Sequence, residues 1–166
     1  MHYLLSSRSP HRHQNASAVS SPKETALRIL SRRDHSEYEL MQKLLLKGFN
    51  HEEIEPVMNS CREYGYLDDL RYALSAIRQG MSKGYGERRI RQLLQQNRVA
   101  DELVNTALQQ LDPDWFQLAK QLAEKKFKAQ AALEVKEQAK RMRFLQSRGF
   151  SFEQIDYALS DQEEMN

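Results

Sequence analysis

Four short stretches of this sequence hold residue types that could do chemistry. Asp34-His35-Ser36 contains the three side-chain types of a hydrolase triad, and His51-Glu52-Glu53 contains types that occur in zinc-binding helices. Lys83-Gly84-Tyr85-Gly86 combines a lysine with glycines, as phosphate-binding loops do, and Asp68-Asp69 could supply an acid and a base. The spacing within each stretch decides whether that chemistry is available.

None of these spacings fits the chemistry. Neighbouring side chains such as those of Asp34 and His35 point apart, whereas a triad is assembled in space. A zinc-binding helix needs a second histidine one turn after the first, and none follows His51 at that distance. Lys83–Gly86 lacks the long glycine-rich run and the terminal Lys-Ser/Thr of a phosphate loop. We therefore expect no enzyme activity, no cofactor and no metal ion.

The stretch around Gly65 is better explained as a connection between two helices. Gly65 stands where a helix can end in the left-handed conformation, which only a residue without Cβ adopts at low cost. Asp68 can then cap the next helix, and Asp69 adds negative charge beside its positive end. Leu67 lies between the end and the start and is placed to enter the core. This pair of aspartates therefore needs no catalytic explanation.

A second turn follows with similar residues. Gly84 and Gly86 bracket Tyr85 in a tight basic turn before an amphipathic run. That run is expected to bury three apolar side chains, Ile90, Leu93 and Leu94.

Composition favours a helical, soluble protein. The 166 residues are 29% charged and 40% hydrophobic, and they include only 6 Gly and 4 Pro. No apolar run approaches the roughly 20 residues that span a bilayer, so we expect no membrane segment. Cys61 is the single cysteine, which excludes an internal disulfide and suits a reducing cytoplasm. It flanks an apolar helical face and is expected to be buried.

The net charge of +2 conceals blocks of alternating sign. Blocks this regular indicate an extended body with separate basic and acidic faces, although they could also pair with one another in the fold. The basic blocks are residues 1–33, 70–100 and 120–148, and the acidic ones are 34–69, 101–119 and 149–166.

Helix-start signals place the beginning of the folded part at Ser21-Pro22, where Pro occupies the first helical position. Ser36 and Glu39 form a capping box for the next helix. The acid-free residues before Ser21 cannot bury enough apolar surface to fold alone, so they form a disordered tail or belong to an over-long start.

An internal repeat organises the rest of the chain. Leu44, Leu94 and Leu145 are about 50 residues apart and start similar apolar patterns, which is typical of a helical repeat array. Gly48 and Gly149 end the corresponding helices, whereas the middle copy has Arg98 and Ala100, so its turn is expected to close differently.

The predicted fold is all-α, an elongated and curved array of three tandem three-helix repeats. The third repeat is expected to start with an Asp112-Pro113 cap and to use Trp115 as a core anchor rather than as a base-stacking platform. The repeats are assigned to residues 22–66, 67–111 and 112–160, between a basic tail, 1–21, and an acidic tail, 161–166.

Cationic and aromatic side chains concentrate in the second and third repeats. They suit either a phosphate backbone or an acidic protein surface, and composition alone does not choose between the two. The candidate binding residues are Arg71, Arg78, Lys83, Tyr85, Arg88, Arg89, Arg91, Lys125, Lys126, Lys140, Arg141 and Arg143.

Motif order then identifies a resemblance. The stretches 33–37, 65–69, 83–86 and 88–93 together resemble the bacterial RecX family over roughly residues 22–160. The resemblance implies tandem three-helix repeats and a monomeric cytoplasmic regulator without cofactor. It also implies modulation, usually inhibition, of the RecA recombinase by docking in the groove of its filament on DNA, with weak direct contact to single- or double-stranded DNA. The alternative is a stand-alone DNA-binding protein that uses its helix pairs as helix-turn-helix modules.

Overall fold

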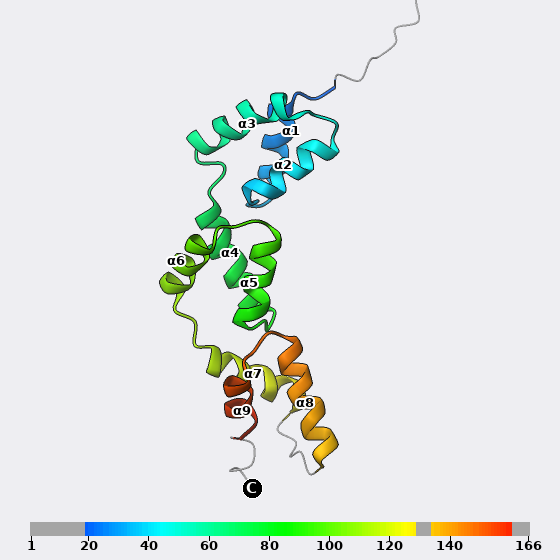
Figure 1. The fold of residues 1–166 in the computed structure, drawn as a ribbon, viewed down its shortest axis with the longest axis vertical. Helices are drawn as coiled ribbons and strands as arrows, with labels where there is room; N and C mark the ends of the chain where they lie inside the picture. The colour runs from blue at the N-terminus through cyan, green and yellow to red at the C-terminus, as the bar shows by residue number, and fades with distance from the viewer. Residues whose placement is uncertain (1–18, 129–133, 161–166) are drawn as a thin grey trace, which may run out of the picture.

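The computed structural model describes residues 19–128 and 134–160, which form nine helices and no strand. The predicted tails, 1–21 and 161–166, lie outside these ranges except for residues 19–21. Figure 1 shows the helices in three consecutive groups along one long axis. They are α1 (Pro22–Leu30), α2 (Glu37–Leu46), α3 (His51–Glu63), α4 (Asp69–Ser82), α5 (Glu87–Gln96), α6 (Asp101–Leu111), α7 (Trp115–Phe127), α8 (Val135–Ser147) and α9 (Phe152–Ser160).

Each group of three helices, here called units 1, 2 and 3, surrounds its own hydrophobic core. Leu44, Leu94 and Leu145 are at most 1% exposed, and each lies three residues before the residue that caps the second helix of its unit (Lys47, Asn97 and Arg148). The predicted all-α array of three three-helix repeats is confirmed.

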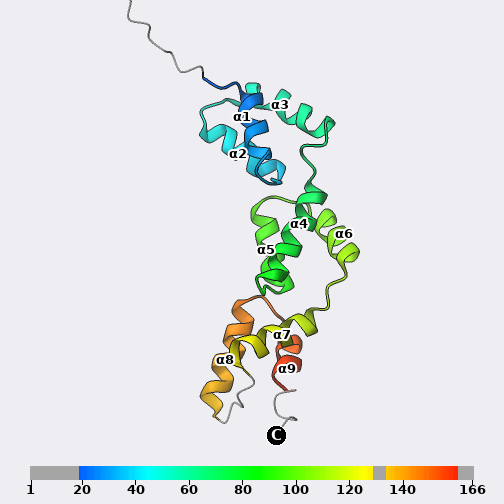
Figure 2. The ribbon, with the colours of Figure 1, turned by 180° about the vertical axis from the view of Figure 1, so that it is seen from behind.

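The second helices of the three units, α2, α5 and α8, lie along the same long edge of the molecule. This edge is on the right in Figure 1 and on the left in Figure 2, where the molecule is seen from behind. Unit 2 is displaced toward α6, away from this edge. The edge formed by α2, α5 and α8 is therefore concave.

The turn after the second helix is the same in all three units. Its left-handed residue is Gly48, Arg98 or Gly149, with φ of +95°, +55° and +98°. The next residue donates a backbone hydrogen bond to the carbonyl of the repeat leucine, over 3.3, 3.0 and 3.3 Å. The expectation that the middle turn, with Arg98 and Ala100, closes differently is therefore wrong. The hydrogen bonds that end the helix offset the cost of about 1–2 kcal/mol for a left-handed residue with Cβ.

Arg98 supplies a test of this backbone strain. We expect Arg98→Gly to be more stable than Arg98→Ala by about 1 kcal/mol, because glycine relieves the strain while both variants lose the guanidinium. Urea unfolding measures the difference. At Gln92, exposed inside α5, the order should reverse, because glycine weakens a helix interior by about 1 kcal/mol relative to alanine. Equal stability of the two Arg98 variants would contradict the prediction.

The predicted starts of α1 and α2 are confirmed, because Ser21 and Ser36 each accept the expected backbone hydrogen bond, and Asn50 caps α3 in the same way. The predicted Asp112-Pro113 cap of α7 is wrong. Since α6 continues to Leu111, Asp112 ends that helix with φ +43°, and Asp114 caps α7 by accepting from the Gln117 N–H at 3.1 Å.

One apolar residue, Leu93, differs from its predicted place, and another, Trp115, is a core anchor as predicted but has a second contact. Leu93 was expected on the inner face of α5 but is 41% exposed, because Ile90 and Leu94 alone fill that face. Trp115 packs against the core of unit 3 and also against the core of unit 2. Its indole therefore joins two units as well as anchoring its own.

Candidate partner-binding surface

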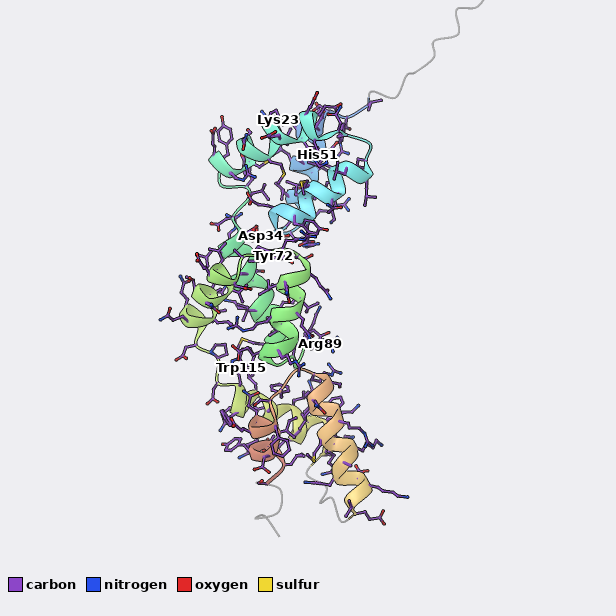
Figure 3. All side chains as sticks on the ribbon, in the orientation of Figure 1. Lys23, Asp34, His51, Tyr72, Arg89 and Trp115 are labelled. Atoms are coloured by element: carbon purple, nitrogen blue, oxygen red, sulfur yellow. The ribbon has the colours of Figure 1, made fainter. Side chains whose placement is uncertain are left out.

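Unit 1 is tied to the start of α4 by charged groups. Asp69 accepts a hydrogen bond from the Glu37 N–H at 2.9 Å, and burial raises the pKa of the Asp69 carboxyl. The Arg71 guanidinium lies 3.1 Å from the Asp34 carboxylate and donates to the Gly65 carbonyl at 2.8 Å. Arg71, predicted as a binding residue, therefore holds unit 1 against unit 2. Figure 3 shows Asp34 at this junction.

A half-buried polar network adjoins this contact. Burial and a hydrogen bond to the Glu39 carboxylate raise the pKa of Tyr72 to about 12, and its hydroxyl accepts from the Asn97 side chain at 2.8 Å. Arg33 donates to the other side of the network, reaching Glu39 at 2.7 Å. Sequence reasoning missed these pairs, because their members come from the α1–α2 turn, α2, α4 and the end of α5.

Close backbone approach joins unit 2 to unit 3. The Gly86 N–H donates to the Arg148 carbonyl at 2.7 Å, and the Arg88 N–H donates to the Gly149 carbonyl at 3.2 Å. A Cβ on Gly86 would lie 2.5 Å from the carbonyl carbon and oxygen of Gly149. Glycine is therefore required at position 86 by the close approach of the Gly149 backbone, because its φ of −83° is open to any residue. Gly84 in the same turn has φ +80°, a conformation that favours glycine.

Aromatic stacking completes this second junction. The Arg89 guanidinium lies 4.0 Å from the centroid of the Tyr85 ring, and that of Arg148 lies 5.8 Å from it. Figure 3 places Arg89 where α5 meets unit 3, with Trp115 at the same level. Tyr85 and Arg89 were both predicted to contact a partner, and here they contact each other.

Two further arginines of the predicted set make internal ion pairs. Arg91 pairs with Glu87 one turn earlier at 3.3 Å. Arg141 is only 3% exposed, pairs with Glu137 at 3.3 Å and lies 4.7 Å from the centroid of the Phe127 ring. The sequence places Arg141 among surface cations, but the fold turns it into unit 3, so it is not available to a partner.

The other predicted cations are exposed. Arg88 on α5 and two cations of α8, Lys140 and Arg143, belong to helices of the concave edge, and the exposed Lys136 of α8 joins them. A hollow of about 440 Å³, which sequence reasoning missed, lies between the start of α5 and the α8–α9 turn, and Arg88 lines it. The exposed set is Arg78, Lys83, Arg88, Lys125, Lys126, Lys140 and Arg143.

The residues first considered for catalysis have separate structural contacts. Asp34 pairs with Arg71, and the Ser36 hydroxyl accepts from the Glu39 N–H as a helix cap. Within residues 19–128 and 134–160, no group of three or more His, Cys, Asp or Glu side chains could hold a metal ion. Over the same ranges no helix is both long and apolar enough to cross a bilayer. Cys61 is buried as predicted, and burial raises the pKa of its thiol.

His35 is buried between α1 and α2. Its Nδ1 lies 3.0 Å from the Arg33 carbonyl and its Nε2 lies 2.7 Å from the Lys43 ammonium. A carbonyl can only accept and an ammonium can only donate, so the ring is neutral with its proton on Nδ1. Burial, with the nearby cations, lowers the pKa of this imidazole.

A pH dependence of stability follows from this neutral histidine. The unfolded chain takes up the proton first, at a pKa of about 6.5, so the free energy of unfolding should fall as the pH is lowered from 7 through that value. The loss continues down to the lower pKa of the folded state. His35→Gln should flatten this part of the profile in urea unfolding between pH 7 and 5. His51→Gln, at an exposed position, should leave the profile unchanged.

Family models cover the three units one by one. The models described as the first, second and third three-helix domains of RecX match residues 23–61, 68–108 and 112–159. "Regulatory protein RecX" of Vibrio vulnificus is 56% identical over 150 residues, covering 90% of this chain and 98% of that protein. The protein of the same description from Chromohalobacter salexigens is 37% identical and covers 84% of this chain and 91% of its own length.

Solved structures share the architecture. The crystal structure of RecX from Lactobacillus salivarius matches with a TM-score of 0.72 at 24% identity, covering 88% of this chain and 97% of that one. A second crystal structure, of a regulatory protein RecX, matches with a TM-score of 0.73 at 27% identity, over 84% of this chain and 71% of that one. The similarity thus extends through all three units.

Proposed function

The chain belongs to the RecX family of regulatory proteins, and from this premise we propose that it binds the RecA filament on DNA and inhibits its recombinase and ATPase activities. It acts in the cytoplasm as a monomer without cofactor or chemistry of its own. Its role is therefore regulation of recombination and DNA repair.

The observation that carries this proposal is a set of exposed cations on α5 and α8, two of the three helices that form the concave edge. Arg88 on α5 and Lys140 and Arg143 on α8 lie on neighbouring units of one elongated body. A concave basic edge that spans two units fits a long, curved, negatively charged partner better than a compact one, and a nucleoprotein filament has that form. The junction contacts stabilise the bend, because backbone hydrogen bonds hold unit 2 against unit 3.

RecA-driven ATP hydrolysis on single-stranded DNA tests the proposal. Adding this protein in substoichiometric amounts should lower the rate of hydrolysis. An unchanged rate at protein excess would overturn it. The alternative, a stand-alone DNA-binding protein, predicts equally tight binding to naked duplex DNA, with a steep decrease as salt is raised.

Arg88→Ala is the variant best suited to this surface. Arg88 is exposed, so its replacement should change the free energy of unfolding by no more than about 0.5 kcal/mol. Binding to RecA-coated single-stranded DNA should weaken, and by less as salt is raised, because salt screens exposed charges. Arg89 is unsuitable, since its loss also removes the stacking on Tyr85.

The matched control is Lys23→Ala, which removes an exposed cation from α1, outside the cation line on α5 and α8. It should leave binding to the coated strand unchanged. If Arg88→Ala and Lys23→Ala bind the coated strand equally well across salt concentrations, Arg88 does not contact the partner and the interface lies elsewhere.

A further inference from the structure

A second concentration of positive charge lies in unit 1, apart from α5 and α8. A hollow of about 390 Å³, here called the α1–α2 pocket, opens between these two helices. Five cationic side chains line it, and no Asp or Glu is among the described residues that do so. The cations are Arg28, Arg32, Arg33, Lys43 and Lys47.

The charge of the pocket is only partly compensated. Arg33 forms an ion pair with Glu39 at 2.7 Å. Lys43 is different, because its ammonium lies 2.7 Å from the neutral ring of His35. The hydrogen bond from Lys43 to Nε2 holds the ammonium in place without neutralising its charge. Arg28 contacts the hydroxyl of Ser20 at 3.0 Å, which is also neutral.

The repeat itself shows that the fold does not need three of these cations, Arg32, Lys43 and Lys47. Unit 2 has the same three-helix arrangement, with α5 starting 50 residues after α2. Basic residues near a helix C-terminus can be favourable, yet neither α4 nor α5 has one in its last turn. At a spacing of 50 residues, Arg32, His35, Lys43 and Lys47 are replaced by Ser82, Tyr85, Leu93 and Asn97, whereas Arg28 and Arg33 correspond to the cations Arg78 and Lys83.

We propose that the α1–α2 pocket binds a ligand that carries linked phosphate groups. Arginine binds pairs of phosphate oxygens with its planar fork, and lysine adds point charges, so the lining has the donors that such a ligand requires. The volume exceeds that of one phosphate, which favours two or more in series. A free polyphosphate, such as that of a nucleotide, and consecutive phosphates of a nucleic acid strand share this chemistry.

This site is independent of the proposed action on RecA, and its test uses the full chain without RecA. Isothermal titration calorimetry at low salt measures the binding of inorganic tripolyphosphate and, separately, of a short single-stranded oligonucleotide. The pocket variant is Arg32→Ser with Lys47→Asn, which installs the residues of unit 2 at exposed positions. The charge-matched control is Lys23→Gln with Lys128→Gln, also at exposed positions but outside the pocket and outside the cation line on α5 and α8.

We expect the pocket variant to bind at least tenfold more weakly and the control to stay within threefold of the parent. Tripolyphosphate should also shift the ring nitrogen resonances of His35 in the parent, since that ring contacts Lys43. Pocket-dependent binding of both ligands indicates a site for free polyphosphate, and pocket-dependent binding of the oligonucleotide alone indicates a strand. The proposal is overturned if neither ligand binds, or if the pocket variant and its control weaken binding equally.

Discussion

Replacing Leu94 by alanine should lower the free energy of unfolding by about 2–5 kcal/mol, as for other fully buried leucines. Its side chain is 1% exposed and lies in the core of unit 2, the unit that connects the other two. The surrounding side chains come from three helices that are held by turns, so they can collapse only partly into the space. A stability loss of this size is a large share of the total for a domain, since folded proteins are only about 5–15 kcal/mol more stable than their unfolded chains.

Leu93→Ala is the matched control. It makes the same chemical change one residue earlier on α5, but this leucine is 41% exposed. Urea unfolding of both variants measures the difference. Leu93→Ala should lower the free energy of unfolding by much less than Leu94→Ala does. Similar costs at both positions would mean that the inner face of α5 is not the one that the structure shows, and the repeat equivalence of Leu94 would fail with it.

Gly86→Ala should open the junction between units 2 and 3, at a cost of about 1–3 kcal/mol or more, as for other insertions into closely packed sites. The added Cβ would lie 2.5 Å from the Gly149 carbonyl and 2.7 Å from the Phe150 nitrogen. These are backbone atoms, which cannot rotate away as the end of a side chain can. The two backbone hydrogen bonds across the junction, from Gly86 and Arg88, should lengthen or break together.

Amide hydrogen exchange measures this opening directly. In the variant the amides of Gly86 and Arg88 should lose protection, while those within α1–α3 keep theirs. Gly65→Ala is the control, because Gly65 has φ +74° and nothing within 4 Å of an added Cβ. It should cost about 1 kcal/mol through backbone strain and leave the junction protected. Protected junction amides in Gly86→Ala would show that the close approach is not required.

The junction has a functional consequence under the proposed mechanism. The helices α5, with the exposed Arg88, and α8, with the exposed Lys140, form one edge only while units 2 and 3 keep their relative orientation. Gly86→Ala should therefore weaken the inhibition of RecA even under conditions in which unit 2 of the variant remains folded. The Leu94→Ala variant should act through unfolding instead.

Local patterns in the sequence were enough to predict the helices and the repeat. Apolar spacing indicates which face of a helix is buried, and Ser21, Ser36 and Asn50 start helices because their side chains satisfy backbone groups within three residues. The glycine at position 65 ends a helix for an equally local reason, its conformation. The expected partner came from the resemblance to a known family, because the spacing of apolar residues carries no information about binding partners.

Where local rules allowed two outcomes, prediction from sequence was less secure. Arg98 stands where the other units have glycine, and only the backbone of the folded turn shows that it adopts the same left-handed conformation. Asp112 can equally start or end a helix, and the length of α6 decides that it ends one. Leu93 and Leu94 are both apolar, and the packing of α5 selects one of them.

By itself, then, the sequence determined three all-helical repeats, their phase and the caps of α1 and α2, because these follow from interactions within a few residues along the chain. The tertiary structure alone decided which charged groups are available to a partner. Arg71 reaches Asp34, 37 residues away, and Arg148 reaches the carbonyl of Lys83, 65 residues away. Such pairs depend on how whole units pack, which no local spacing encodes. The same packing buries Arg141 and leaves Arg88 exposed on α5.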